Sequence, residues 1–359
     1  MTIRASAVVV VLVSVAAGCS GSPQSGENLP PINPKAASMK EGFSTMERLR
    51  DAAKREGVLN VVGLPRTWVN YAEILDRFSD KYGIKVIATA PDASSRQEVD
   101  AVRQGGAGAP DVVDLSLDVA VANAKLFAPY KVAAWRDIPD QLKDPKGNWF
   151  AGYGGYMSIG YDPRVIQAPS SYTSLLKPGT TVALPGDPLR MASAFSGVMA
   201  ASLSDGKADA ARGVDFFSKI KKSGLLSQPD RAASVIDWDF LNTARAEASD
   251  REGKPAWKVA IPRDAVLAAY YVQAINANAP HPAAARLWEE FLLSDEGQNL
   301  LLKGYARPIR MEAMDMRGTL DQGAAAKLAK VDGTPVVLTI PEQDQAKSYL
   351  KTHWSQAVG

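Results

Sequence analysis

Residues 58–89 read VLNVVGLPRTWVNYAEILDRFSDKYGIKVIAT, and this stretch decides the fold class. Its first six residues, VLNVVG, are apolar apart from Asn60, which is typical of a buried strand. From about Asn70 the apolar residues recur at helical spacing along one face, and Gly83 is suited to end that helix. Residues 84–89 then predict a second strand. The stretch therefore predicts a strand–helix–strand unit with its first loop at Gly63–Trp68.

The same alternation continues along the chain. We expect a helix from Ser95, where Ser95 and Glu98 have the spacing of a capping box. Strands alternating with helices predict an α/β protein with mostly parallel sheets flanked by helices. The further strands are expected at residues 111–115, 157–161, 181–184, 235–237 and 266–275, and the further helices at 191–201, 211–222 and 283–293.

Composition excludes several classes of protein. The chain has 359 residues, of which 46% are hydrophobic and 22% are charged, as in ordinary globular domains. A net charge of +2 does not provide the excess of positive charge that binds a polyanion, which argues against a nucleic-acid binder. One cysteine excludes an intramolecular disulfide framework, and two histidines argue against a histidine-rich metal centre. We expect no cofactor and no metal.

The N-terminus predicts export. Residues 1–18 combine Arg4, a short apolar run and small residues, as in a signal peptide. Ala16–Cys19 resembles the bacterial lipobox, whose cysteine becomes a lipidated first residue; the alternative is an ordinary signal with an incidental cysteine. Residues 20–35 contain nine Gly, Ser or Pro among sixteen, which predicts a flexible linker. We therefore expect a tether at 19–44 that holds the body at the extracytoplasmic face of a membrane, in the periplasm or at the cell surface.

Several segments of the body resemble one family, the extracellular solute-binding proteins of ABC importers with the type II periplasmic-binding fold. The resemblance covers roughly residues 50–355 and is nearest to the spermidine/putrescine branch. The segments are EGVLNVVG (56–63), FSDKYGIKV (78–86), APDVVDL (109–115), GYMSIGYDPRVI (155–166) and, most specifically, NANAPHPAAARLWEEFLLSDEGQNLLLKGYARPI (276–309).

The resemblance implies two interleaved lobes hinged around a ligand cleft. Lobe one would be 45–160 plus 239–308, and lobe two 161–238 plus 309–359. A monomer would close on a small solute and deliver it to a membrane permease without chemical conversion. The rival class is a secreted enzyme on this scaffold, but the sequence contains no GxSxG elbow and no evident Ser-His-acid set.

Aromatic and acidic residues at strand ends are the candidate ligand contacts. Trp68 lies in the first strand-to-helix loop, where polyamine binders place a cleft aromatic; it could stack on an alkylammonium or pack in the core. Asp237-Trp238-Asp239 ends an apolar strand and suits an organic cation, although one aspartate could cap the following helix. In a strand, Trp238 would face opposite to both aspartates.

Further candidates rest mainly on the resemblance. Asp187 lies where polyamine binders carry an acidic residue, and it could equally be a turn residue. Arg190 departs from the polyamine pattern and could grip a carboxylate or phosphonate instead. Four tyrosines could reach the cleft, although adjacent ones point to opposite faces of a strand; they are Tyr153, Tyr156, Tyr270 and Tyr271. A polyamine is the first expected ligand, with ferric iron, thiamine and aminoethylphosphonate as alternatives.

Overall fold

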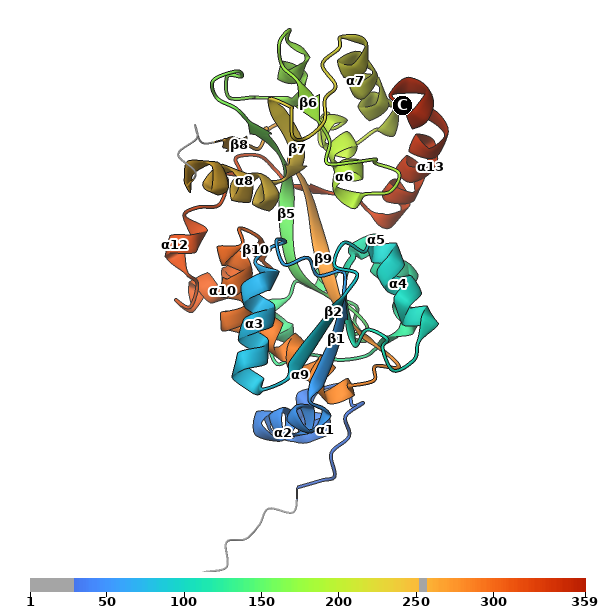
Figure 1. Cartoon of the computed structure of the whole chain (residues 1–359), viewed down its shortest axis with the longest axis vertical. Helices are drawn as coiled ribbons and strands as arrows, with labels where there is room; N and C mark the ends of the chain where they lie inside the picture. Colours follow the sequence, from blue (N-terminus) through green and yellow to red (C-terminus); the bar gives the residue numbers. More distant parts are fainter. Residues whose placement is uncertain (1–28, 252–256) are drawn as a thin grey trace, which may run out of the picture. The chain divides into compact units, whose positions relative to one another are not determined.

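Two long strands, β5 (Phe150–Tyr161) and β9 (Leu267–Asn276), run antiparallel through the fold in this computed structural model (Figure 1). The structure describes residues 29–251 and 257–359, and residues 31–359 form one compact unit. The predicted signal peptide and Cys19 lie outside the described residues. β5 pairs with β9 through Tyr156 and with β7 (Ser234–Trp238) from Met157 onward. β5 therefore belongs to two sheet regions. We call the part that contains β2, β1, β3 and β9 the first sheet region, and the part that contains β7 and β6 the second.

The strand order is β2-β1-β3-β9-β5-β7-β6. β2 (Lys85–Thr89), β1 (Val58–Val62) and β3 (Val112–Ser116) pair in parallel, as β6 (Val182–Ala183) does with β7. The short strands that join this path are β4 (Phe127–Ala128), β8 (Lys258–Ala260), β10 (Arg307–Pro308) and β11 (Val336–Val337). The α/β class is confirmed. The sheet is mixed, because β5 and β9 run antiparallel to each other and β9 also runs antiparallel to β3.

Helices cover the sheet faces. Those of the first sheet region are α1 (Met39–Phe43), α2 (Met46–Glu56), α3 (Tyr71–Tyr82), α4 (Ser95–Gln104), α5 (Leu117–Ala122), α9 (Pro282–Leu292), α10 (Asp295–Lys303), α11 (Met311–Met316) and α12 (Gln322–Ala325). Those of the second are α6 (Ala192–Ala201), α7 (Ala210–Lys222), α8 (Asp239–Arg251) and α13 (Ile340–Ala357). Short 3-10 turns occur at Ala124–Leu126, Trp135–Asp137, Asp140–Leu142 and Tyr172–Leu176. Among the described residues, no helix has the length and apolar character needed to cross a bilayer.

Local signals place most helix ends correctly. Gly83 ends α3 in the left-handed region at φ 66°, as predicted. The capping box of α4 differs by one residue, since Ser94 and Gln97 form it rather than Ser95 and Glu98. Glu98 is instead only 2% exposed and accepts the Asp114 backbone N–H at 3.1 Å. The inward position of the Glu98 carboxylate explains why the pair one residue earlier in the chain, Ser94 and Gln97, provides the cap.

The glycine-rich segment before residue 157 is also strand. β5 begins at Phe150, whereas we expected a strand only over 157–161. A Cβ on Gly155 would lie 2.7 Å from the Phe240 ring, and one on Gly154 would lie 2.6 Å from the Tyr270 ring. Glycine therefore lets two aromatic rings lie directly on the strand backbone, which a propensity-based reading counts against a strand.

Candidate functional site

Five aromatic side chains meet where the two sheet regions join; we call Trp68, Tyr153, Trp238, Phe240 and Tyr271 the aromatic cluster. Trp68 stands edge-on to Phe240 and Tyr271, with ring centroids 5.2 and 5.5 Å apart. Tyr153 stacks on Tyr271 at 5.3 Å, and Trp238 stacks on Phe240 at 6.1 Å. Four of the predicted ligand residues are therefore neighbours, and Phe240 is a fifth member that the sequence reading missed.

A chain of hydrogen bonds holds Trp68 in place. Its indole N–H donates to the Tyr153 hydroxyl at 2.8 Å, and that hydroxyl donates to Asp114 Oδ2 at 2.8 Å. Tyr71 and Gln273 also donate to Asp114, at 2.7 and 2.9 Å. Trp68 is half-buried whereas Tyr153 is fully buried, so the chain runs from an accessible ring to a buried carboxylate. Such support orients the indole before any ligand arrives.

Two carboxyl groups near the cluster have strongly perturbed acidity. Burial raises the pKa of Asp114 from 3.8 to about 6, against the opposing effect of its three hydrogen-bond donors. Burial also raises the pKa of Asp237 to about 7, opposed by the Trp238 backbone N–H and by Arg245. Among the ion pairs of the described residues, none involves Asp237. Desolvation dominates both shifts, and a cation placed nearby would lower both pKa values.

Asp239 differs because a cation already contacts it. Its carboxylate is 1% exposed and lies 3.2 Å from Arg307 Nη2, and it accepts the Tyr156 backbone N–H at 2.9 Å. The Arg307 guanidinium also lies over the Tyr156 ring, 4.8 Å from its centroid. Burial raises the pKa of Asp239, and Arg307 opposes that shift. Asp239, Tyr156 and Arg307 thus form a closed group beside the aromatic cluster.

The loop between β1 and α3 lines a pocket of about 270 Å³, which we call the loop pocket. Val69 and Asn70 in the loop have positive φ values of 38° and 68°, and Tyr305 across the pocket has φ 67°. Such strained residues concentrate at ligand sites. The pocket lies next to the aromatic cluster because Phe240 belongs to both. Its lining residues are Arg66, Thr67, Val69, Asn70, Phe240, Leu241, Ala244, Lys303, Gly304 and Tyr305.

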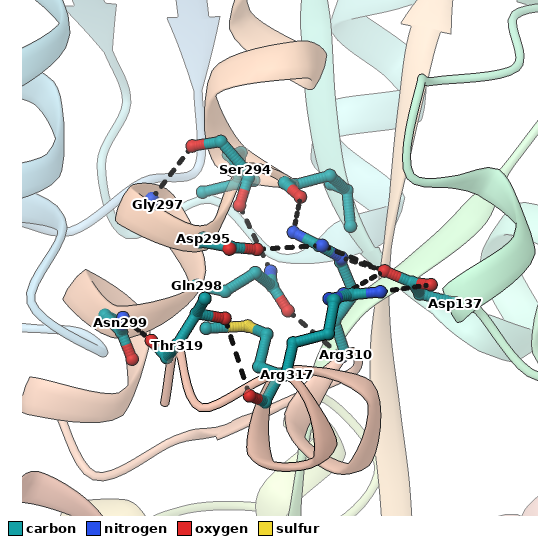
Figure 2. A network of polar contacts seen from close by, with 12 residues as sticks. Asp137, Ser294, Asp295, Gly297, Gln298, Asn299, Arg310, Arg317 and Thr319 are labelled. Carbon is teal, nitrogen blue, oxygen red and sulfur yellow. Dashed lines mark hydrogen bonds and ion pairs between the residues drawn. The ribbon is translucent and has the colours of Figure 1, made fainter. Parts of the chain in front are cut away.

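A polar network anchors the chain just after β10, as Figure 2 shows. Arg310 is 6% exposed, and its Nη2 lies 2.8 Å from both Asp137 Oδ2 and Asp295 Oδ1. Arg317 adds a second contact to Asp137 at 2.6 Å, which lowers the pKa of that carboxyl. Gln298 accepts the Arg310 backbone N–H at 3.2 Å. The network holds the segment that carries Arg307 against the first sheet region.

The remaining predicted contacts lie apart from the aromatic cluster. Asp187 and Arg190 are exposed and face each other at 3.8 Å, in the turn before α6. Tyr270 packs against Gly154, whereas Tyr271 stacks on Tyr153, so the two tyrosines point to opposite faces of β9 as expected. We expected Trp238 to face away from Asp237 and Asp239. All three side chains are buried, so their exposure does not separate one face from the other. The ligand roles of all ten residues stay predictions.

Three residues of the site were not predicted from the sequence: Phe240, Asp114 and Arg307. Asp114 carried a signal, since an acidic residue inside the apolar run DVVDL must find buried partners. Phe240 directly follows the acidic–aromatic turn and could have been grouped with it. Arg307 had no local signal, because its partner Asp239 is 68 residues away in the chain.

Comparison with known proteins gives a family and a fold. Residues 111–332 match the model of the family described as bacterial extracellular solute-binding protein. No curated protein matches. Among solved structures, iron-bound HitA from Pseudomonas aeruginosa has a TM-score of 0.61 at 19% identity, over 84% of this chain and 99% of that one.

Two further structures are similar in fold. AgtB from A. tumefaciens R10 in complex with agropinic acid has a TM-score of 0.64 at 15% identity, over 84% of this chain and 98% of its own. A Listeria monocytogenes protein assigned to spermidine/putrescine ABC transport has a TM-score of 0.62 at 15% identity, with the same coverage of 84% and 98%. At these identities the likeness concerns the fold, and the ligands in the names differ from one protein to the next.

Proposed function

The chain belongs to the family of bacterial extracellular solute-binding proteins, and we propose that it captures a small organic solute and delivers it to an ABC permease. The family implies an exported protein. The observation that carries the proposal is Trp68: a half-buried indole, oriented by hydrogen bonds and surrounded by aromatic edges, at the junction of two sheet regions. Such a ring offers a stacking face to an organic solute. The protein supplies affinity and closure and performs no reaction.

We propose that the two sheet regions are the two lobes and that β5 and β9 are the hinge. Residues 45–160 with 239–308, and 161–238 with 309–359, remain our starting division. The packing of α8 on β7 and β8, and the pairing of β8 with β5 at Ile159–Tyr161, support moving α8 and β8 into lobe two. The packing of α12 on α10 supports moving α11 and α12 into lobe one. A strand shared between lobes bends with little loss of hydrogen bonds, which suits closure around a solute.

An organic cation, with a polyamine as first candidate, is the proposed solute class. The aromatic cluster can stack on an alkylammonium group. Asp114 and Asp237 lie near the cluster and are buried without an ion pair among the described residues, and burial raises the pKa of each. A cationic solute would supply a positive charge. We propose that Trp68, Tyr153, Trp238 and Tyr271 contact the solute. Residues outside the cluster would act on it without direct stacking; they are Tyr156, Asp187, Tyr270, Asp237 and Asp239.

An anionic solute is the second candidate, favoured by the loop pocket. Arg66 and Lys303 line it, although each has an acidic neighbour: Asp76 lies 2.5 Å from Arg66 and Glu73 lies 3.4 Å from Lys303. Exposed pairs of this kind are weak and exchange partners readily. Arg190 is 88% exposed and could serve a carboxylate or phosphonate in the same way.

A thermal-shift panel tests the proposal. The protein is melted with putrescine, spermidine, thiamine, ferric iron and aminoethylphosphonate; a true solute at 100 times its Kd should stabilise by about 2.7 kcal/mol. Trp68→Leu should abolish the shift, whereas Trp257→Leu, a half-buried indole in the second sheet region, should keep it. A rise in melting temperature with aminoethylphosphonate alone would favour the anionic solute over the organic cation. Turnover of a bound compound would contradict a receptor.

We also propose that Cys19 is lipidated and anchors the protein at the membrane through a tether that ends before α1, because Phe43 of α1 is fully buried in the core. The support is the lipobox-like sequence Ala16–Cys19. Mass spectrometry of the protein from a bacterial membrane fraction should show a diacylglyceryl-modified N-terminal cysteine. Cys19→Ser should move the protein from the detergent phase to the aqueous phase. Equal partitioning of both forms would indicate an ordinary signal peptide.

A further inference from the structure

The chain places one of its own cations in a site built for a cation. The Arg307 guanidinium lies 4.8 Å from the Tyr156 ring centroid and contacts Asp239 Oδ2 through Nε at 3.3 Å and Nη2 at 3.2 Å. A carboxylate beside an aromatic face is the arrangement that recognises alkylammonium and guanidinium groups. Asp239 was one of the carboxylates expected to bind the solute, and here its partner is a side chain.

Burial and existing contacts close the Asp239 carboxylate to a second cation. Oδ1 accepts the Tyr156 backbone N–H at 2.9 Å, Oδ2 is held by Arg307, and the side chain is 1% exposed. An ammonium group could bind there only by displacing the guanidinium. The displaced guanidinium would lose a charge-assisted contact, so the exchange has little net gain.

Arg307 is also held in place from its other side. It lies in β10, opposite Gly154 of β5, and its Nη2 donates to the Ala329 carbonyl at 2.6 Å. Arg310, three residues further along and itself buried, is anchored by the polar network of Figure 2. The Arg307 side chain is 19% exposed. These contacts favour a permanent internal counter-ion over a mobile arm.

We propose that Arg307 determines specificity by occupying Asp239, so that the solute carries at most one positive charge. Of the two carboxylates that flank Trp238, Asp239 is paired with Arg307, and Asp237 makes no ion pair among the described residues. Asp114 already accepts hydrogen bonds from three uncharged donors. One unpaired carboxylate beside Trp238 matches one ammonium group. This inference rests on the proposed function: it narrows the solute class from organic cations to monoamines and replaces the polyamine as first candidate.

Calorimetric titration with putrescine and butylamine tests the inference, since the two amines have the same carbon chain and differ by one ammonium group. The wild-type protein should bind putrescine no more tightly than butylamine. Arg307→Gln should raise the affinity for putrescine relative to butylamine by at least about tenfold, as expected for one new charge-assisted contact. Lys327→Gln removes an equal charge from an exposed pair with Glu247 and should leave the ratio unchanged.

A double variant guards against misfolding and indirect effects. Asp239→Asn/Arg307→Gln removes both charges, so it leaves no buried charge unpaired and should show no putrescine gain. An equal gain in the double variant, or a wild-type preference for putrescine of tenfold or more, would overturn the inference. So would a folded Arg307→Gln protein that binds no amine. If wild type binds no amine but Arg307→Gln gains putrescine, the role of Arg307 stands and the organic-cation function fails.

Discussion

Asp114 is the residue on which the site depends most. It gathers hydrogen bonds from Tyr71, Tyr153 and Gln273, which come from three different elements. Through Tyr153 it also sets the orientation of Trp68. The cost is a buried carboxyl group, and desolvation raises its pKa to about 6. The same group therefore orders the site and makes the stability of the fold depend on pH.

The sign of that dependence follows from the raised pKa. Between about pH 4 and pH 6 the folded state keeps a proton on Asp114 that the unfolded chain releases, so the free energy of unfolding falls as pH rises. A shift from 3.8 to about 6 corresponds to about 3 kcal/mol. Asp114→Asn should lack this loss. The unfolding free energy of wild type minus that of the variant, measured by urea unfolding, should therefore fall by about 3 kcal/mol from about pH 4 to pH 7.

A matched variant separates Asp114 from the other carboxyl groups. Asp140→Asn changes a side chain that is 98% exposed, and its unfolding curve should run parallel to wild type across the pH range. Parallel curves for Asp114→Asn as well would mean that the buried carboxyl titrates normally. The constant offset between wild type and either variant carries no information, because substitution also changes hydrogen bonding.

At the scale of elements, the site depends on a close approach of two loops. The β1–α3 loop carries Trp68, and the α10–β10 turn presses against it through Gly304. A Cβ on Gly304 would lie 2.3 Å from the Val69 carbonyl carbon and 2.6 Å from the Asn70 nitrogen. Asn70 also donates to the Leu300 carbonyl at 3.1 Å. The strained φ values of Val69 and Asn70 are held by this contact.

Gly304→Ala should push the β1–α3 loop away and misplace Trp68. Backbone atoms cannot yield as a flexible side chain does, so we expect a loss of about 1–3 kcal/mol in unfolding free energy. Solute affinity should fall with it, and Trp68 fluorescence should shift to longer wavelength. Gly108→Ala, at a position with no atom within 4 Å, serves as the control and should change neither. Normal affinity in Gly304→Ala would show that the loop contact does not position Trp68.

The elements were largely predictable because their signals are local. Apolar runs and helical spacing placed β1, α3, β3 and β9 within one or two residues. The first half of β5 was missed because its glycines weaken any strand signal, and their purpose is visible only once Phe240 and Tyr270 lie on them. Strand ends pointed to Trp68 and Trp238, whereas Tyr153 and Tyr271 were candidates mainly through the resemblance. The pairing of Arg307 with Asp239 was not predictable, since it joins distant segments through tertiary packing.

At the scale of the whole molecule, one ion pair connects the C-terminal helix to the opposite sheet region. Lys347 of α13 contacts Asp118 at the start of α5, and its Nζ lies 5.3 Å from the Phe195 ring centroid. Figure 1 labels both helices. α13 packs on α7 in the second region, whereas α5 packs on β9 in the first. Asp118 is 13% exposed. A partly buried pair of this kind is screened less by salt than a fully exposed one.

We therefore expect the Lys347–Asp118 pair to stabilise the closed, solute-bound form. Lys347→Gln should leave the melting temperature of the free protein within about 2 °C, because neither lobe needs the pair to fold. It should speed solute dissociation about three- to tenfold, measured by stopped flow, with association nearly unchanged. Lys219→Gln removes a 2.7 Å pair with Asp215 inside α7 and is the matched control. Equal dissociation rates for wild type and Lys347→Gln would show that the pair plays no part in closure.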